Sequence, residues 1–232
     1  MSYNDEELND LTYELALKND IRTFFQYYIS LLKAKHILIF TFCNNKDYNS
    51  KIIKINLFLY NLALYLAINT LFFDDNTMHR IYEDKGSFNL NYQLPQIIYS
   101  SFISSLFNII LKTLALSEGL ILEFKSKKEN ENKNLDEILK KLNYKIKIKF
   151  FAYFMICSIF LIFFWFYLSI FCAIYVNIQI HLIKNSLISY ILSLVYPLGI
   201  NLIPGIFRIL ALSSPKLKRN YLYNISKILQ LI

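Results

Sequence analysis

The chain has 232 residues, of which 55% are hydrophobic, 17% aromatic and only 18% charged. Soluble globular proteins carry about 25% charged residues, and the mean hydropathy here is +0.34, so the composition argues against a soluble enzyme and indicates a membrane protein. The 25 Lys and Arg residues outnumber the 17 Asp and Glu residues, which gives a net charge of +8. In membrane proteins such an excess usually faces the anionic cytoplasmic leaflet.

The first predicted element runs from Phe24 to Phe42 and carries Lys33, Lys35 and His36 at its middle. A central lysine costs about 2.5–3.5 kcal/mol in a spanning helix, which argues against a span. The apolar residues of the segment recur at helical spacing, at Phe24, Tyr28, Leu31, Leu32 and Ile39. The sequence therefore predicts an amphipathic helix that lies along the membrane interface, within an N-terminal segment of residues 1–51.

Four later stretches are apolar enough to cross about 30 Å of hydrocarbon, which takes roughly 20 helical residues. They run from Ile55 to Phe73, from Leu94 to Leu116, from Phe150 to Val176 and from Leu187 to Leu212. Residues 52–116 and 150–212 would each form a transmembrane hairpin. Pro95 would lie in the first turn of the second span, where its missing N–H costs nothing.

The distribution of Lys and Arg predicts how these spans are oriented. Six lie before Ile52, nine between Ser117 and Lys149 and four after Leu212, whereas the two remaining connections hold three in all. Positively charged loops stay on the cytoplasmic side. We therefore expect both termini and the loop of residues 117–149 to be cytoplasmic, with two short loops outside.

The cytoplasmic loop and the tail are also predicted to be helical. In the loop, Asp136 and Glu137 precede Lys140 and Lys141 by four residues, a spacing that stabilises a helix. The tail, residues 213–232, places a basic cluster before apolar residues at helical spacing, which are Tyr221, Ile225, Ile228, Leu229 and Ile232. The sequence thus predicts an all-α polytopic membrane protein with four transmembrane helices plus interfacial and cytoplasmic amphipathic helices.

The fourth span contains helix-breaking residues near its middle, which are Pro197, Gly199, Asn201, Pro204 and Gly205. A broken membrane helix frees carbonyl groups, and transporters bind ions at such breaks near the midplane, where Asn201 would lie. The alternative is a kinked helix in which Asn201 bonds a neighbour. We favour the kink, because transporter sites of this kind usually come as a pair of broken helices in two related halves.

Several polar residues of the spans have simple structural interpretations. Lys54, Lys112 and Arg208 are expected to reach phosphate headgroups, as are Lys216, Lys218 and Arg219 of the tail. Ser100, Ser101, Ser104 and Ser105 form a small-residue face, of which Ser101 and Ser105 are the clearest packing candidates. For Asn56, Asn61, Asn69 and Asn108 we favour hydrogen bonds between helices over a permeation path.

No enzyme signature can be assembled from the sequence. His79 could share a helix face with Asp75 or Glu83 in the first outside loop, but a metal site needs at least three converging ligands. We expect no cofactor, no metal and no nucleic-acid partner.

Three stretches resemble a known group of proteins. They are LTYELALKNDIRTFFQYYISLLKAKHILIFTF (11–42), FFDDNTMHRIYEDKGSFNLNYQLPQIIYSS (72–101) and FCAIYVNIQIHLIKNSLISYILSLVYPLGINLIPGIFRILAL (171–212). Their hydrophobic pattern and short local strings are similar to the C-terminal membrane region of large, mostly uncharacterised protist surface proteins. The resemblance implies a membrane module that follows a large ectodomain, without known catalytic residues. Because Met1 lies just before the module, we expect a stand-alone copy or an incomplete gene model.

On these grounds we expect an integral membrane anchor or scaffold module without catalytic activity. Its basic cytoplasmic surfaces would contact anionic lipid or a partner protein, and copies of the chain could associate with one another. The alternative is a transporter or channel subunit that uses the broken fourth helix. A membrane-embedded enzyme ranks third.

Overall fold

The computed structural model describes residues 3–43, 47–130, 135–213 and 219–230, and within these ranges every regular element is a helix. The predicted all-α class is therefore confirmed. Two compact units are present: Asp47–Ser193 forms one, and Met1–Lys46 together with Leu194–Ile232 forms the other. We call them the span unit and the terminal unit.

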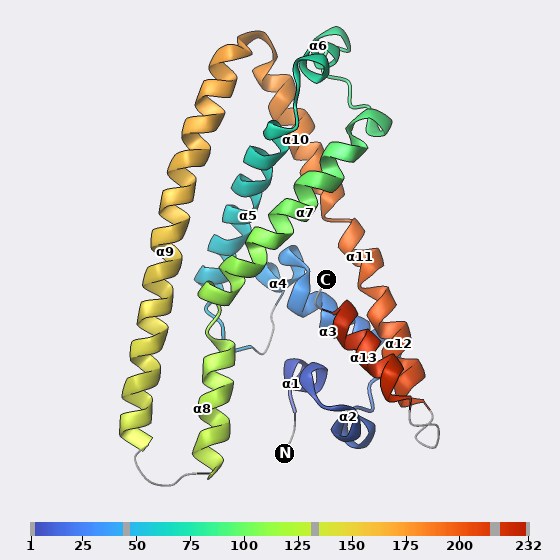
Figure 1. Cartoon of the computed structure of the whole chain (residues 1–232), viewed down its shortest axis with the longest axis vertical. Coiled ribbons are helices and arrows are strands. Elements are labelled where there is room, and N and C mark those ends of the chain that lie inside the picture. Colours follow the sequence, from blue (N-terminus) through green and yellow to red (C-terminus); the bar gives the residue numbers. More distant parts are fainter. Residues whose placement is uncertain (1–2, 44–46, 131–134, 214–218, 231–232) are drawn as a thin grey trace. The chain divides into compact units, whose positions relative to one another are not determined.

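The span unit contains three of the long apolar helices in full (Figure 1). Its elements in chain order are α5 (Lys51–Leu71), α6 (Asp75–Glu83), α7 (Leu90–Ala115), α8 (Glu118–Asn130), α9 (Leu135–Ile174), the short 3₁₀ helix η1 (Val176–Ile178) and α10 (Gln179–Ser193). In α5, α7 and α9, and in the stretch Val176–Leu212, the chain has four segments long and apolar enough to cross a membrane, as predicted.

Pro95 does not lie in the first turn of its helix, so that prediction was wrong. α7 begins at Leu90, which makes Pro95 the sixth residue. Its ring has no N–H to bond to the carbonyl of Asn91. The hydrophobic pattern marks only the apolar part of the helix, whereas polar residues extend the helix by one turn before it.

α9 is a single helix of 40 residues. At 1.5 Å per residue it is about 60 Å long, twice the thickness of a bilayer core. Its polar first turns pack beside α8 (Figure 1), in the loop that the sequence predicted to be helical. Its apolar half leaves large side chains exposed, including Ile162 (69%), Trp165 (69%) and Phe166 (66%). Such a surface needs an apolar environment.

α5, α7 and α10 pack against one another (Figure 1). Hydrogen bonds between polar side chains join the three helices. Asn69 of α5 donates to the Ser186 hydroxyl and accepts from the Ser100 hydroxyl, both over 3.2 Å. Tyr190 donates to Asn61 over 3.1 Å. We call this contact the polar seam, defined by Asn61, Tyr65 and Asn69 of α5, Ser100 and Ser104 of α7, and Asn185, Ser186, Ser189 and Tyr190 of α10.

The terminal unit joins the two ends of the chain. Its elements are α1 (Asp5–Asp10), α2 (Tyr13–Asn19), α3 (Phe24–Lys35), α4 (Ile37–Phe42), α11 (Tyr196–Ile200), α12 (Leu202–Leu212) and α13 (Asn220–Leu229). Its apolar core contains Leu11, Ala16, Ala211 and Tyr223. Residues from both ends of the sequence thus share one core.

The predicted interfacial helix of residues 24–42 is two helices. The chain is extended at His36, with φ −71° and ψ 114°, so α3 ends there and α4 begins. Thr23 begins α3 with a capping box that includes Gln26. On the face expected to meet the membrane, Leu31 and Leu32 are buried within the protein instead.

The predicted tail helix is present as α13, and its two faces differ. Tyr223 and Ser226 are buried, whereas Tyr221, Ile225 and Ile228 are exposed. These three residues follow i, i+4, i+7 spacing and therefore share one face. An exposed apolar face of this kind suits a helix that lies on a membrane.

Candidate functional site

The fourth predicted span is divided among α10, α11 and α12, with the first interruption after Ser193. Pro197 and Pro204 each lack a backbone N–H. α11 ends at Ile200, and Asn201 connects it to α12 with φ −68° and ψ −8°. Of the predicted break residues, Pro197 and Gly199 therefore belong to α11, and Pro204 and Gly205 to α12.

The Asn201 side chain lies within the break and forms a hydrogen bond to its backbone. Its Nδ2 donates to the carbonyl of Pro197 over 2.8 Å, and the backbone N–H of Asn201 donates to the same oxygen over 3.1 Å. Only 7% of Asn201 is exposed. This geometry is that of a kinked helix in which the asparagine side chain adds a second hydrogen bond to the Pro197 carbonyl.

Two side chains of the N-terminal helices bond further carbonyls near the break. Tyr28 donates its hydroxyl to the Leu198 carbonyl over 2.8 Å. His36 Nε2 lies 2.8 Å from the Leu194 carbonyl oxygen. In membrane proteins, neighbouring helices commonly satisfy the carbonyls that a helix break frees. Here Tyr28 of α3 and His36, the residue at which α3 ends, bond these carbonyls.

The hydrogen bond of His36 fixes its tautomer. A carbonyl can only accept, so Nε2 must carry a proton. Within the described ranges, Nδ1 is buried and has no hydrogen-bond partner.

α12 is in close contact with α3 and α13. A Cβ atom on Gly205 would lie 2.8 Å from Phe24 Cε2, so only glycine fits without movement of that ring. Next to it, the Pro204 carbonyl accepts from the Ser226 hydroxyl over 2.8 Å. At Gly199, by contrast, a Cβ would have no neighbour within 4 Å.

The sequence predicted that Arg208 reaches lipid headgroups, but its side chain is completely buried in the protein (0% exposed). Its Nη2 and Nε donate to Asp20 Oδ2 over 2.7 and 3.0 Å. Nη2 also donates to the Leu8 carbonyl over 2.6 Å. The guanidinium carbon lies 4.8 Å from the ring centre of Tyr27 and 4.9 Å from that of Tyr223.

We call Arg208, Asp20, Tyr27 and Tyr223, with the Leu8 carbonyl, the arginine cage. A buried charge is stable only if it is paired and hydrogen-bonded, and aromatic faces add cation–π attraction. Burial raises the pKa of Tyr27, although the charge of Arg208 opposes this, so the phenol stays neutral. The cage joins α1, α3, α12 and α13 around one cation.

Asp20 also binds a second arginine. Arg22 Nε donates to Asp20 Oδ1 over 2.7 Å. Burial alone would raise the pKa of Asp20, but the hydrogen bonds and charges of Arg22 and Arg208 outweigh it and hold the pKa below its usual value. The carboxylate is thus ionised at neutral pH and neutralises both guanidinium groups in part.

Sequence reasoning missed the partners of Arg208. Asp20 lies 188 residues away in the chain, so no local spacing links the two. The sequence did indicate that a partner exists, because an arginine inside an apolar segment needs a group that pairs with its charge. Few acidic residues lie close to Phe24–Phe42 in the sequence, and Asp20 is one of them.

The other predicted headgroup residues have varied surroundings. Lys54 is buried and forms an ion pair with Asp47. Lys112 lies in the last turn of α7 and is partly buried. Arg219 Nη1 donates to the Leu210 carbonyl over 3.2 Å. Lys216 and Lys218 lie outside the described residues.

Of the two serines singled out for packing, Ser101 is buried and Ser105 partly exposed. Each hydroxyl bonds within its own helix, Ser101 to Ile97 O over 2.6 Å and Ser105 to Phe102 O over 2.7 Å. The interhelical bonds come from Ser100 instead, one position away on α7.

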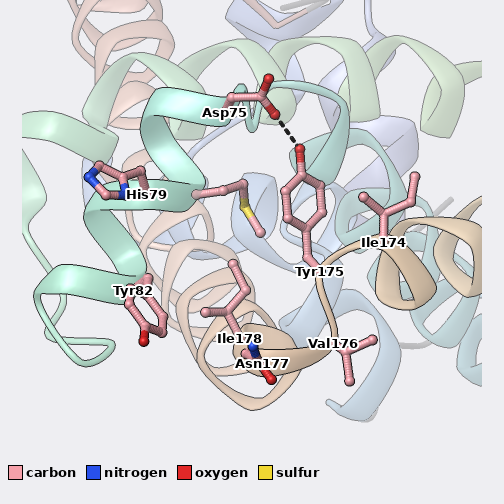
Figure 2. Close-up of a pocket in the computed structure, with 9 residues that line it drawn as sticks. Asp75, His79, Tyr82, Ile174, Tyr175, Val176, Asn177 and Ile178 are labelled. Atoms are coloured by element: carbon pink, nitrogen blue, oxygen red, sulfur yellow. Dashed lines mark hydrogen bonds between the residues drawn. The ribbon is translucent and has the colours of Figure 1, made fainter.

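A surface pocket of about 310 Å³ lies between α6 and the end of α9 (Figure 2). The Tyr175 hydroxyl donates to Asp75 Oδ1 over 2.5 Å, and both residues line the pocket. His79 pairs with Glu83 over 3.1 Å. Among the residues that the structure describes, no three His, Cys, Asp or Glu side chains gather as metal ligands would.

A second pocket, of about 400 Å³, lies in the terminal unit. It is lined by Asn9, Asp10, Leu31, Ala34, Lys35, Lys227, Ile228 and Gln230. Burial lowers the pKa of Lys35 to about 8. Lys227 donates to the Asp10 carbonyl over 2.9 Å. Two ammonium groups beside the apolar Ile228 and Leu31 give this pocket both a basic and an apolar wall.

The chain matches no family model, no curated protein and no solved structure.

Proposed function

We propose that the chain is a multi-pass membrane anchor or scaffold module without catalytic activity, with both termini and residues 117–149 in the cytoplasm. The observation that carries the proposal is the outward apolar face of α9. This helix is the most apolar of the four candidate spans and the least buried, because only 11% of its most apolar 18-residue stretch lies inside the protein. A surface of this kind is stable in lipid and not in water.

The helix break supports a scaffold more than a transporter. Transport at a broken helix requires polar groups that are available to a substrate. Asn201 is buried and bonded to Pro197 within its own chain segment, and Tyr28 holds the carbonyl of Leu198. These bonds stabilise one fixed geometry of the break. The transporter or channel alternative would need them to open.

The partner that fits the terminal unit best is anionic lipid. The Lys35 and Lys227 pocket adjoins α13, whose Tyr221, Ile225 and Ile228 are exposed. An amphipathic helix with lysines beside its apolar face binds anionic membrane surfaces. A phosphate in the pocket would also favour the charged form of Lys35 over the neutral form that burial favours.

The similarity to the membrane region of large surface proteins, seen in the sequence, agrees with an anchoring role. An anchor attaches another protein or domain to the membrane and does not require a substrate-binding site.

Fusion to a soluble fluorescent protein tests the proposal. The fusion should stay in the membrane fraction after alkaline carbonate extraction, and purified chain in vesicles should carry no ion or solute flux above empty vesicles. Asn201→Leu should leave membrane retention unchanged. Release by carbonate would refute the anchor, and a flux that Asn201→Leu abolishes would establish the transporter alternative.

A further inference from the structure

The polar seam contains buried groups that the protein does not satisfy. Asn185 is 0% exposed, and Ser104 is 3% exposed. Within the described part of the chain, neither Nδ2 nor Oδ1 of Asn185 has a hydrogen-bond partner, and the Ser104 hydroxyl has none. These groups come from two different helices, α10 and α7, that pack against each other.

The unpaired groups lie within about one helical turn of the hydrogen bonds that Asn69 makes. Asn69 bonds both Ser100 of α7 and Ser186 of α10, which aligns these two helices at one height. Ser104 is one turn from Ser100, and Asn185 is adjacent to Ser186. The unpaired amide and hydroxyl therefore flank the bonded centre of the polar seam.

The chemistry of these groups defines what would bind them. A buried amide or hydroxyl without a partner is destabilising, so a partner is favoured strongly. The groups include a donor, an acceptor and a hydroxyl that can do both, so the ligand must donate and accept. The residues that define the polar seam are amides, hydroxyls and phenols, which offer no countercharge for an ion.

We propose that the polar seam binds internal water molecules, held by Asn185 and Ser104 between α7 and α10. Buried waters of this kind typically make about three hydrogen bonds to polar groups that lack other partners. This site goes beyond an anchoring role. It would be an internal binding site for small neutral molecules that both donate and accept hydrogen bonds.

X-ray hydroxyl-radical footprinting of the purified full chain in detergent tests the proposal, because radicals form from water next to a side chain. Tyr65 packs against Tyr190 in the polar seam, with ring centres 5.2 Å apart and the ring planes tilted by 58°. Tyr60 lies on the same helix and packs on Phe164 instead. Surface exposure alone would not make Tyr65 react faster than Tyr60, because Tyr65 is 1% exposed and Tyr60 is 4% exposed.

If water occupies the polar seam, Tyr65 and Tyr190 should be oxidised several-fold faster than Tyr60. Equal, slow oxidation of all three would overturn the proposal. The measurement does not depend on an anchoring role, so its failure would leave the proposed function standing.

Two variants and one control variant locate the water. Asn185→Leu and Ser104→Ala should reduce oxidation of Tyr65 towards the rate of Tyr60, whereas Ser101→Ala should not, since that hydroxyl is bonded to Ile97. Size-exclusion chromatography and circular dichroism would verify that each variant is folded. An unchanged rate in folded Asn185→Leu, or a raised melting temperature of this variant with Tyr65 unreactive in the parent, would refute the assignment.

Discussion

The guanidinium of Arg208 lies 2.7 Å from the carboxylate of Asp20, and both side chains are almost fully enclosed. This pair connects the segment before α3 to α12, and Tyr223 brings α13 onto the same cation. A single arginine therefore joins the N-terminal helices, the end of the fourth apolar segment and the tail of the chain.

Loss of Asp20 should destabilise the protein more than loss of Arg208. Asp20→Ala leaves a buried guanidinium without its carboxylate, which costs about 3–5 kcal/mol. Arg208→Met should cost less, because Asp20 keeps Arg22. Thermal unfolding of the detergent-solubilised variants measures the difference. Equal melting temperatures for the parent and Asp20→Ala would contradict the role given to the arginine cage.

Lys35 should make stability rise with pH above neutrality. Its folded pKa of about 8 lies below the unfolded value of about 10.4. The cost of burying the ammonium is therefore fully present below pH 8 and is relieved as pH rises from about 8 to about 10.4.

Melting temperatures measured across this range should show the rise in the parent and not in Lys35→Met. Lys35→Met should also melt higher than the parent at neutral pH. Lys33→Met on the same helix controls for the lost charge and should keep the pH dependence. The same slope in the parent and Lys35→Met would disprove the assignment.

The two glycines near the break should respond oppositely to alanine. Gly205→Ala would place a Cβ 2.8 Å from Phe24, and overpacking of this kind costs about 1–3 kcal/mol. Gly199→Ala has open space and should stabilise its helix by about 0.5–1 kcal/mol, since alanine loses less backbone entropy. A lower melting temperature for Gly199→Ala than for Gly205→Ala would show that the contact of α12 with α3 is misassigned.

Tyr28→Phe should destabilise the break. It removes the donor to the Leu198 carbonyl, and an unsatisfied buried partner costs about 1–3 kcal/mol. Tyr221→Phe is a matched control, because Tyr221 is exposed on α13 and should melt as the parent does. If the two variants unfold at the same temperature, the hydroxyl of Tyr28 does not stabilise the break.

Composition and hydrophobic runs were enough to predict an all-helical chain with four apolar segments, because a spanning length of apolar residues is a local property. The position of Asn201 in a kinked helix could also be anticipated, since proline removes a donor wherever it lies. These features depend on neighbours in the sequence.

The environment of Arg208 could not be predicted in the same way. Its partners come from both ends of the chain, and the sequence offered lipid phosphate as an equally good partner for an arginine near the end of a span. The buried positions of Leu31 and Leu32 were missed for a related reason, because an apolar helix face can pack on protein as well as on lipid.

The most direct test of the account is the sidedness of the two loops, measured by engineered glycosylation. Acceptor sequons would be placed between Asp74 and Gln93 and, in a second variant, between Lys125 and Lys149. In microsomes, the account predicts glycosylation of the first loop and not of the second. Glycosylation of the second loop and not the first would contradict the orientation, and glycosylation of both would contradict the four spans.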